Sequence, residues 1–238
     1  MTSRPNAQVF VALDMTAADS AERMAAQLSG HVDGVKLGLE FFAANGPTGV
    51  ERIRRSGQPV FLDLKLHDIP NTVAGAVRAI LPLEPKILTV HAAGGRAMLG
   101  AAAAAAKERG PTPPLVVAVT VLTSLDEGDL REVGQASPAI DQVLRLADLA
   151  QRAGVDGIVC SPLEVAAVRA RCGRDFVLVV PGIRPETARR DDQKRVMTPA
   201  EAVDAGADVL VIGRPITAAA DPTRAARDIA AALKCARP

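Results

Sequence analysis

The amino-acid sequence predicts the α/β class and a single (β/α)8 barrel of the TIM type, with one domain over residues 1–238. Short runs of β-branched and aliphatic residues alternate eight times with longer helical patterns, and no Pro-, Gly- or Ser-rich linker interrupts them. Polar residues also follow several predicted strands, as barrel enzymes require at the carboxyl ends of their strands. A doubly wound open sheet is the alternative. Its glycine-rich fingerprint would follow the first strand, where Leu13-Asp14-Met15-Thr16 stands instead.

The first two strands are predicted at residues 9–13 and 32–37, where β-branched and aliphatic residues recur at every second position. Side chains alternate between the two faces of a strand. With the aliphatic positions facing the surrounding helices, Phe10 and Asp14 point into the barrel from the first strand and Lys36 points inward from the second.

The third strand, at residues 60–65, is the most informative part of the chain. One face is wholly aliphatic, while Phe61, Asp63 and Lys65 share the other. Burying charge is costly unless the charge is paired or used in chemistry. A buried ion pair with only a structural role is the alternative, but convergence of both groups with Lys36 from the neighbouring strand favours a reaction centre.

The remaining elements continue the same alternation to the end of the chain. The run at 101–106 is all alanine, the residue with the highest helix propensity, and Gly110 suits the end of that helix. Further strands are predicted at residues 86–91, 115–122, 157–160, 176–180 and 209–212. Helices are predicted at residues 17–28, 41–55, 73–81, 96–109, 140–152, 163–171, 199–205 and 222–234.

Composition excludes several classes of partner. The formal net charge is +1, and Trp and Tyr are absent, so neither a basic surface nor stacking platforms favour nucleic acid. The N-terminus lacks the apolar stretch of a signal peptide, and no apolar run is long enough to span a membrane. The three cysteines, Cys160, Cys172 and Cys235, are widely spaced, which favours a reducing, cytoplasmic location without a disulfide framework or zinc site.

Two loops after predicted strands have the features of a phosphate cradle. Pro181-Gly182-Ile183-Arg184 follows the seventh strand, and Gly213-Arg214 follows the eighth. Glycine lets backbone N–H groups approach an anion, and arginine forks onto phosphate oxygens. The loops after strands seven and eight are the usual phosphate site of such barrels, so we expect a phosphorylated small molecule here. Turns with solvated arginines are the alternative.

The long polar segment at residues 184–197 is predicted either as a lid over the phosphate or as a solvated surface loop. The histidines have no metal-ligand spacing, and His91 is interpreted as a hydrogen-bonded lining residue rather than a base. Cys160 is interpreted as a small buried thiol. No metal site is therefore predicted.

Six ordered blocks of the sequence resemble those of the orotidine 5′-phosphate decarboxylase family over essentially the whole chain. The segment 63–72, DLKLHDIPNT, is similar to the family's D-x-K-x-x-D signature. The other blocks are ALD at 12–14, VKLG at 35–38, VLTS at 121–124, PGIR at 181–184 and VIGRP at 211–215.

The resemblance implies decarboxylation of orotidine 5′-phosphate to UMP, the last step of de novo pyrimidine synthesis, without metal or organic cofactor. It implies that Lys65 is the catalytic lysine beside the carboxylated carbon, in a charge network with Lys36, Asp63 and Asp68. A homodimer with shared active sites is implied, to which Asp68 and Thr72 would contribute across the interface. The implied substrate-binding residues are Asp14 and Lys36 for the ribose, Thr123 or Ser124 for the pyrimidine, and Arg184, Gln193, Gly213 and Arg214 for the phosphate, with Gln193 on the lid.

Two rival functions share the fold. A sister group of Mg²⁺-dependent sugar-phosphate decarboxylases and synthases resembles E-x-G-T at the end of the second strand, where its Glu helps to bind metal. This chain has Lys36 within VKLG instead, and a cation there disfavours a metal. A catalytically silent nucleotide-binding barrel is the other rival, but it would have little use for both Lys65 and the Asp pair.

Overall fold

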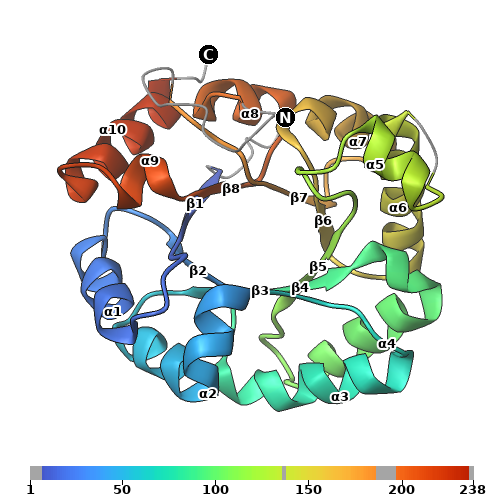
Figure 1. Ribbon diagram of the computed structural model, residues 1–238, viewed down its shortest axis with the longest axis horizontal. Coiled ribbons are helices and arrows are strands. Elements are labelled where there is room, and N and C mark those ends of the chain that lie inside the picture. Colours follow the sequence, from blue (N-terminus) through green and yellow to red (C-terminus); the bar gives the residue numbers. More distant parts are fainter. Residues whose placement is uncertain (1–6, 136–137, 186–196, 236–238) are drawn as a thin grey trace.

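Eight parallel strands close into a barrel in sequence order, from β1 beside β2 round to β8 beside β1. The computed structural model describes residues 7–135, 138–185 and 197–235. Helices form a ring around the strands (Figure 1). The predicted α/β class and (β/α)8 barrel are confirmed.

The strands are short, and most connections between them contain a helix. The strands are β1 (Gln8–Ala12), β2 (Gly34–Gly38), β3 (Val60–Leu66), β4 (Ile87–His91), β5 (Leu115–Val119), β6 (Gly157–Val159), β7 (Val177–Val180) and β8 (Val209–Ile212). The α-helices are α1 (Ala18–Gln27), α2 (Leu39–Arg55), α3 (Pro70–Ile80), α4 (Gly95–Lys107), α5 (Glu127–Glu132), α6 (Ala139–Ala153), α7 (Val165–Cys172), α8 (Pro199–Ala205), α9 (Arg214–Thr217) and α10 (Pro222–Cys235).

Two apolar layers follow from the strand alternation. The larger layer lies between the strands and the helices, and the smaller one fills the barrel interior. The interior layer contains Phe10 and Phe61, whose rings meet edge to face with centroids 6.0 Å apart. The predicted inward direction of these two residues is confirmed. Gly34 gives the Phe10 ring its space, because a Cβ at residue 34 would lie 2.5 Å from the Phe10 Cε1 atom.

Several predicted boundaries are wrong for identifiable reasons. The second strand starts at Gly34 rather than residue 32, and the Asp33 carboxylate instead accepts a hydrogen bond from the Val9 N–H at 2.8 Å. The third helix starts at Pro70 rather than residue 73, because proline is well suited to the first turn of a helix.

The fifth strand ends at Val119 rather than residue 122. The following loop leads into the short helix α5, which the sequence analysis missed. That helix is too short for a visible apolar period, but Asp126 and Asp129 form a capping box at its start.

Candidate active site

A cavity of about 250 Å³ opens where β1, β2, β3 and β5 to β8 end. Its inner wall is apolar and includes Phe61, Val179 and Val211, which belong to the barrel interior. Most of the predicted site residues line it: Asp14, Lys36, Asp63, Lys65, Thr123, Arg184, Gly213 and Arg214. The cavity therefore brings together side chains from both ends of the sequence.

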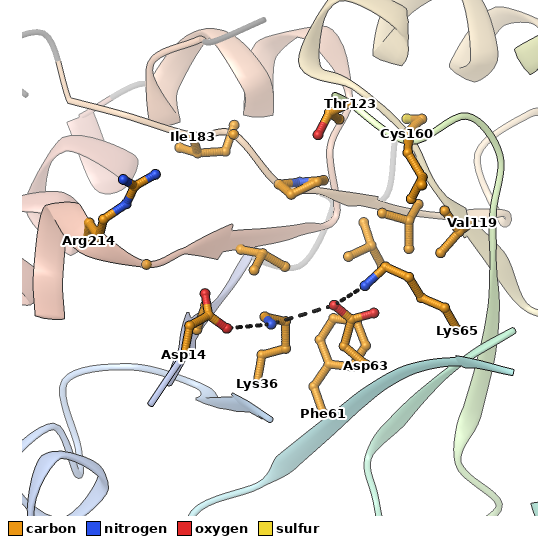
Figure 2. Close-up of a pocket in the computed structure, with 18 of the residues that line it drawn as sticks. Asp14, Lys36, Phe61, Asp63, Lys65, Val119, Thr123, Cys160, Ile183 and Arg214 are labelled. Carbon is orange, nitrogen blue, oxygen red and sulfur yellow. Dashed lines mark hydrogen bonds and ion pairs between the residues drawn. The ribbon is translucent and has the colours of Figure 1, made fainter. Parts of the chain in front are cut away.

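Four charged side chains of alternating sign form a row across the pocket (Figure 2). Asp14 Oδ1 lies 3.1 Å from Lys36 Nζ, and Lys36 Nζ lies 3.5 Å from Asp63 Oδ2. Lys65 Nζ donates to the same Asp63 Oδ2 at 2.8 Å. The predicted convergence of Lys36, Asp63 and Lys65 is therefore confirmed.

Asp63 is the centre of this row. Burial of its side chain acts to raise the pKa of the carboxyl, but the charges of Lys36 and Lys65, with hydrogen bonds from Lys65 and Thr89, lower that pKa below its ordinary value. The carboxylate is therefore charged at neutral pH. The row as a whole is neutral, with two carboxylates and two ammonium groups, and the two arginines that also line the pocket, Arg184 and Arg214, give the pocket a net positive charge for an anionic ligand.

The backbone around Lys65 departs from a regular strand. Pairing between β3 and β4 shifts from Leu62 beside Leu88 to Leu66 beside Val90. Lys65 takes a left-handed conformation, with φ of 49°. Simple alternation predicted the direction of Lys65 but missed this irregularity, which sets the position from which its side chain enters the pocket.

Thr89 is a buried residue of the site that sequence reasoning missed. Its hydroxyl accepts a hydrogen bond from the Lys65 backbone N–H at 2.8 Å and donates one to Asp63 Oδ1 at 3.0 Å. The available signal was a polar residue between Leu88 and Val90 in an otherwise apolar strand core. Such a hydroxyl needs hydrogen-bond partners when it is buried.

Both arginines predicted to bind phosphate line the pocket, and Arg214 lies on the opposite side of it from Lys65 in Figure 2. Arg184 follows β7 and is buried, whereas Arg214 is exposed at the start of α9. Figure 2 shows Arg214 on the same side as Asp14, with Thr123 and Cys160 on the other. An elongated anion could therefore contact an arginine at one end and Lys65 at the other.

The two residues that bound the predicted lid, Arg184 and Met197, contact each other. The Arg184 N–H donates to the Met197 carbonyl at 3.0 Å, and Ile183 pairs with Met197 in an isolated bridge. Gln193, predicted on that lid, lies outside the described residues.

Asp68, Thr72 and Ser124 do not line this pocket. Asp68 is exposed beyond β3, and its Oδ1 atom accepts the backbone N–H of Ile69 at 2.6 Å. Thr72 is exposed in the first turn of α3. Of the two hydroxyl residues predicted for the pyrimidine, Thr123 lines the pocket and Ser124 is exposed to solvent.

His91 is hydrogen-bonded, as predicted. It does not line the cavity, so the prediction that it is a lining residue is wrong. Its Nδ1 atom accepts the Ala93 N–H at 3.3 Å, and its ring stacks on His67 with centroids 5.1 Å apart. These contacts hold the ring at the carboxyl end of β4, of which His91 is the last residue. Burial, followed by the charges of His67 and Lys65, lowers the pKa of His91.

The thiol of Cys160 lines the cavity and is buried, as predicted. Burial raises its pKa, which keeps the thiol neutral and unreactive. Within residues 7–135, 138–185 and 197–235, no three His, Cys, Asp or Glu side chains are grouped as a metal site. No helix in these ranges has the length and apolar character needed to cross a membrane.

Comparison with known proteins gives one consistent result. Residues 7–229 match the model of the "Orotidine 5′-phosphate decarboxylase / HUMPS family". The orotidine 5′-phosphate decarboxylase of Paramagnetospirillum magneticum is 59% identical, over 94% of this chain and 97% of that protein. The Rhodospirillum rubrum enzyme of the same name is 57% identical, over 97% and 94%. The crystal structure of the Lactobacillus acidophilus orotidine 5′-phosphate decarboxylase is similar with a TM-score of 0.86 at 37% identity, covering 96% of this chain and 99% of that one.

Proposed function

The chain belongs to the orotidine 5′-phosphate decarboxylase / HUMPS family, and we propose that its row of charges performs the decarboxylation through Lys65. The protein is an enzyme, a carbon–carbon lyase that converts orotidine 5′-phosphate to UMP and CO₂ in pyrimidine biosynthesis. The observation that carries the proposed mechanism is a lysine ammonium held 2.8 Å from a partly buried carboxylate inside the pocket.

Lys65 supplies both charge stabilisation and a proton. When the bond to the carboxylate breaks, CO₂ leaves and the electron pair remains on the ring carbon, with no conventional electron sink. The ammonium of Lys65 is complementary to this negative charge, and it then donates a proton to the carbon. Solvent restores the proton on the lysine. Asp63 accepts a hydrogen bond from the ammonium and holds it in place. In this mechanism Asp63 lies on the side of the departing carboxylate.

The remaining pocket residues bind the nucleotide. Asp14 and Lys36 hold the ribose hydroxyls, and Thr123 or Ser124 contacts the pyrimidine, with Thr123 favoured because it lines the pocket. The phosphate is held by Arg184, Gln193, Gly213 and Arg214, with Gln193 on a lid. Phosphate binding far from the reacting carbon contributes energy that aligns the ring.

Asp68 and Thr72 complete the active site of a partner subunit in a homodimer. Both are exposed and outside the pocket of their own chain, although Asp68 is only three positions from Lys65. Large apolar side chains are also exposed just after β2, β3 and β5, at the same barrel face: Leu39, Ile69 and Leu122. Exposed apolar side chains on the barrel face that holds the pocket favour a second copy as their cover.

We also propose that this enzyme acts in the cytoplasm. Cys160 and Cys172 are unbridged, as expected in a reducing compartment.

Turnover of orotidine 5′-phosphate should survive exhaustive treatment with EDTA. The reason is that the charges in the pocket come from protein side chains, and Lys36 stands where the Mg²⁺-dependent sister group has a Glu. The measurement is release of labelled CO₂ before and after chelation. Activity that disappears with EDTA and returns with Mg²⁺ would contradict the proposal and favour the sugar-phosphate group.

Arg214→Ala should weaken transition-state stabilisation for orotidine 5′-phosphate by about 2–3 kcal/mol, the size of a lost set of charged hydrogen bonds. The measurement is kcat/KM for the nucleotide and for orotidine, which lacks the phosphate and should respond little. Arg55→Ala removes an exposed arginine at the far end of α2 and serves as the control. Equal damage to both substrates would show that Arg214 does not bind the phosphate.

A further inference from the structure

The hydroxyl of Thr89 closes a ring of hydrogen bonds around the proposed catalytic lysine. The Lys65 backbone N–H donates to Thr89 Oγ1 at 2.8 Å, and Thr89 Oγ1 donates to Asp63 Oδ1 at 3.0 Å. The other oxygen, Asp63 Oδ2, accepts from Lys65 Nζ at 2.8 Å. The path therefore leaves the backbone of Lys65 and returns to the ammonium of the same residue.

The irregularity in β3 explains why this hydroxyl is needed. Between the pairs Leu62–Leu88 and Leu66–Val90, three residues of β3 face one residue of β4, and that residue is Thr89. Strand residues in such a bulge lose their regular backbone partners. The N–H of Lys65 therefore needs another acceptor, because an unpaired backbone N–H away from water is costly. The hydroxyl of Thr89 supplies it.

The left-handed backbone conformation of Lys65 also requires a group that holds it in place. A non-glycine residue with φ of 49° is strained, and it persists only where its surroundings hold it. Thr89 is fully buried in β4, so its hydroxyl is a fixed point against which the strained residue is held.

We propose that Thr89 is a positioning residue for the decarboxylation, which orients Asp63 and fixes the backbone of Lys65 so that the ammonium faces the reacting carbon. The inference rests on the proposed role of Lys65. A lysine side chain loses considerable rotamer entropy when it is ordered. Because the backbone N–H and the ammonium of Lys65 are both held before substrate binds, this entropy is lost on folding and not in the chemical step. Thr89 itself does not line the cavity, so it acts through its two neighbours.

The test is Thr89→Val, which keeps the shape of the side chain and removes the hydroxyl. We expect kcat to fall by about tenfold or more, the rate equivalent of one buried hydrogen-bond partner lost. KM should change by less than about threefold, because the arginines and Asp14 still bind the nucleotide. Thr89→Ser, which keeps the hydroxyl, should restore most of kcat.

Thr120→Val is the matched control. Thr120 is a buried threonine just after β5 whose hydroxyl donates to the Val159 carbonyl at 3.0 Å, and it does not line the pocket. It should lose stability in the same way as Thr89→Val but keep its kcat. If Thr89→Val does not fold, Thr89→Ala and Thr89→Ser give the same comparison, because both lack the methyl group and only Ser has the hydroxyl.

The outcomes separate this inference from the mechanism on which it rests. If wild type is active, Lys65→Ala is inactive and Thr89→Val has the same kcat as Thr120→Val, the role of Thr89 is overturned and that of Lys65 stands. A failure of Thr89→Ser to exceed Thr89→Ala would also overturn it. If Lys65→Ala keeps its activity, the proposed mechanism itself is wrong.

Discussion

Replacement of Lys65 by alanine should lower kcat for orotidine 5′-phosphate by roughly 10⁴-fold or more, because one change removes both the stabilising charge and the proton donor. Asp63 would keep only Lys36 as a cationic neighbour, at 3.5 Å. The carboxylate of Asp63 would then repel the substrate carboxylate with less compensation. The deficit should therefore appear in kcat and, to a smaller degree, in KM.

The measurement is single-turnover and steady-state release of CO₂ by the variant. Lys86→Ala is the matched control, since it removes an exposed lysine at the amino end of β4, across the barrel from the pocket. Retained binding of UMP by Lys65→Ala would show that the pocket is intact. A variant that binds UMP and still turns over substrate at a rate near wild type would refute the catalytic role of Lys65.

The inward direction of the charges could be predicted from sequence because it follows from local geometry. Alternation along a strand needs only neighbouring residues, and it correctly pointed Phe10, Lys36 and Asp63 into the barrel. The gathering of residues from distant strands could also be predicted, since the closed barrel brings all carboxyl ends to one face. The fold and the location of the pocket can therefore be predicted from a single sequence.

The position of Lys65 could not be predicted in full, because it depends on a register shift between two strands. That shift arises from pairing between residues 62–66 and residues 88–90, which are far apart in the sequence. Thr89 gains its role only through the shift, so alternation alone gave no reason to select it. The direction of the Asp68 side chain could not be predicted either. Asp68 lies in the loop between β3 and α3, where strand alternation no longer applies.

The exposed position of Asp68 leads to a prediction about activity in dimers that mix two variant subunits. Lys65→Ala and Asp68→Ala should each be nearly inactive alone if every active site combines Lys65 of one subunit with Asp68 of the other. In a mixed dimer, one site carries both substitutions and the other carries neither. Random reassortment of equal amounts should therefore restore about a quarter of the wild-type sites, by the symmetry of an isologous dimer.

The control mixture combines Lys65→Ala with Asp63→Ala. These two residues are in contact at 2.8 Å within one chain, so every site of a mixed dimer keeps one substitution and no activity should be gained. Native mass spectrometry verifies subunit exchange in both mixtures. Recovery in the first mixture alone requires Asp68 to act across the interface. If exchanged dimers of Lys65→Ala and Asp68→Ala stay inactive, Asp68 serves its own subunit, and its loop must move inward from the exposed position in which it accepts the Ile69 N–H.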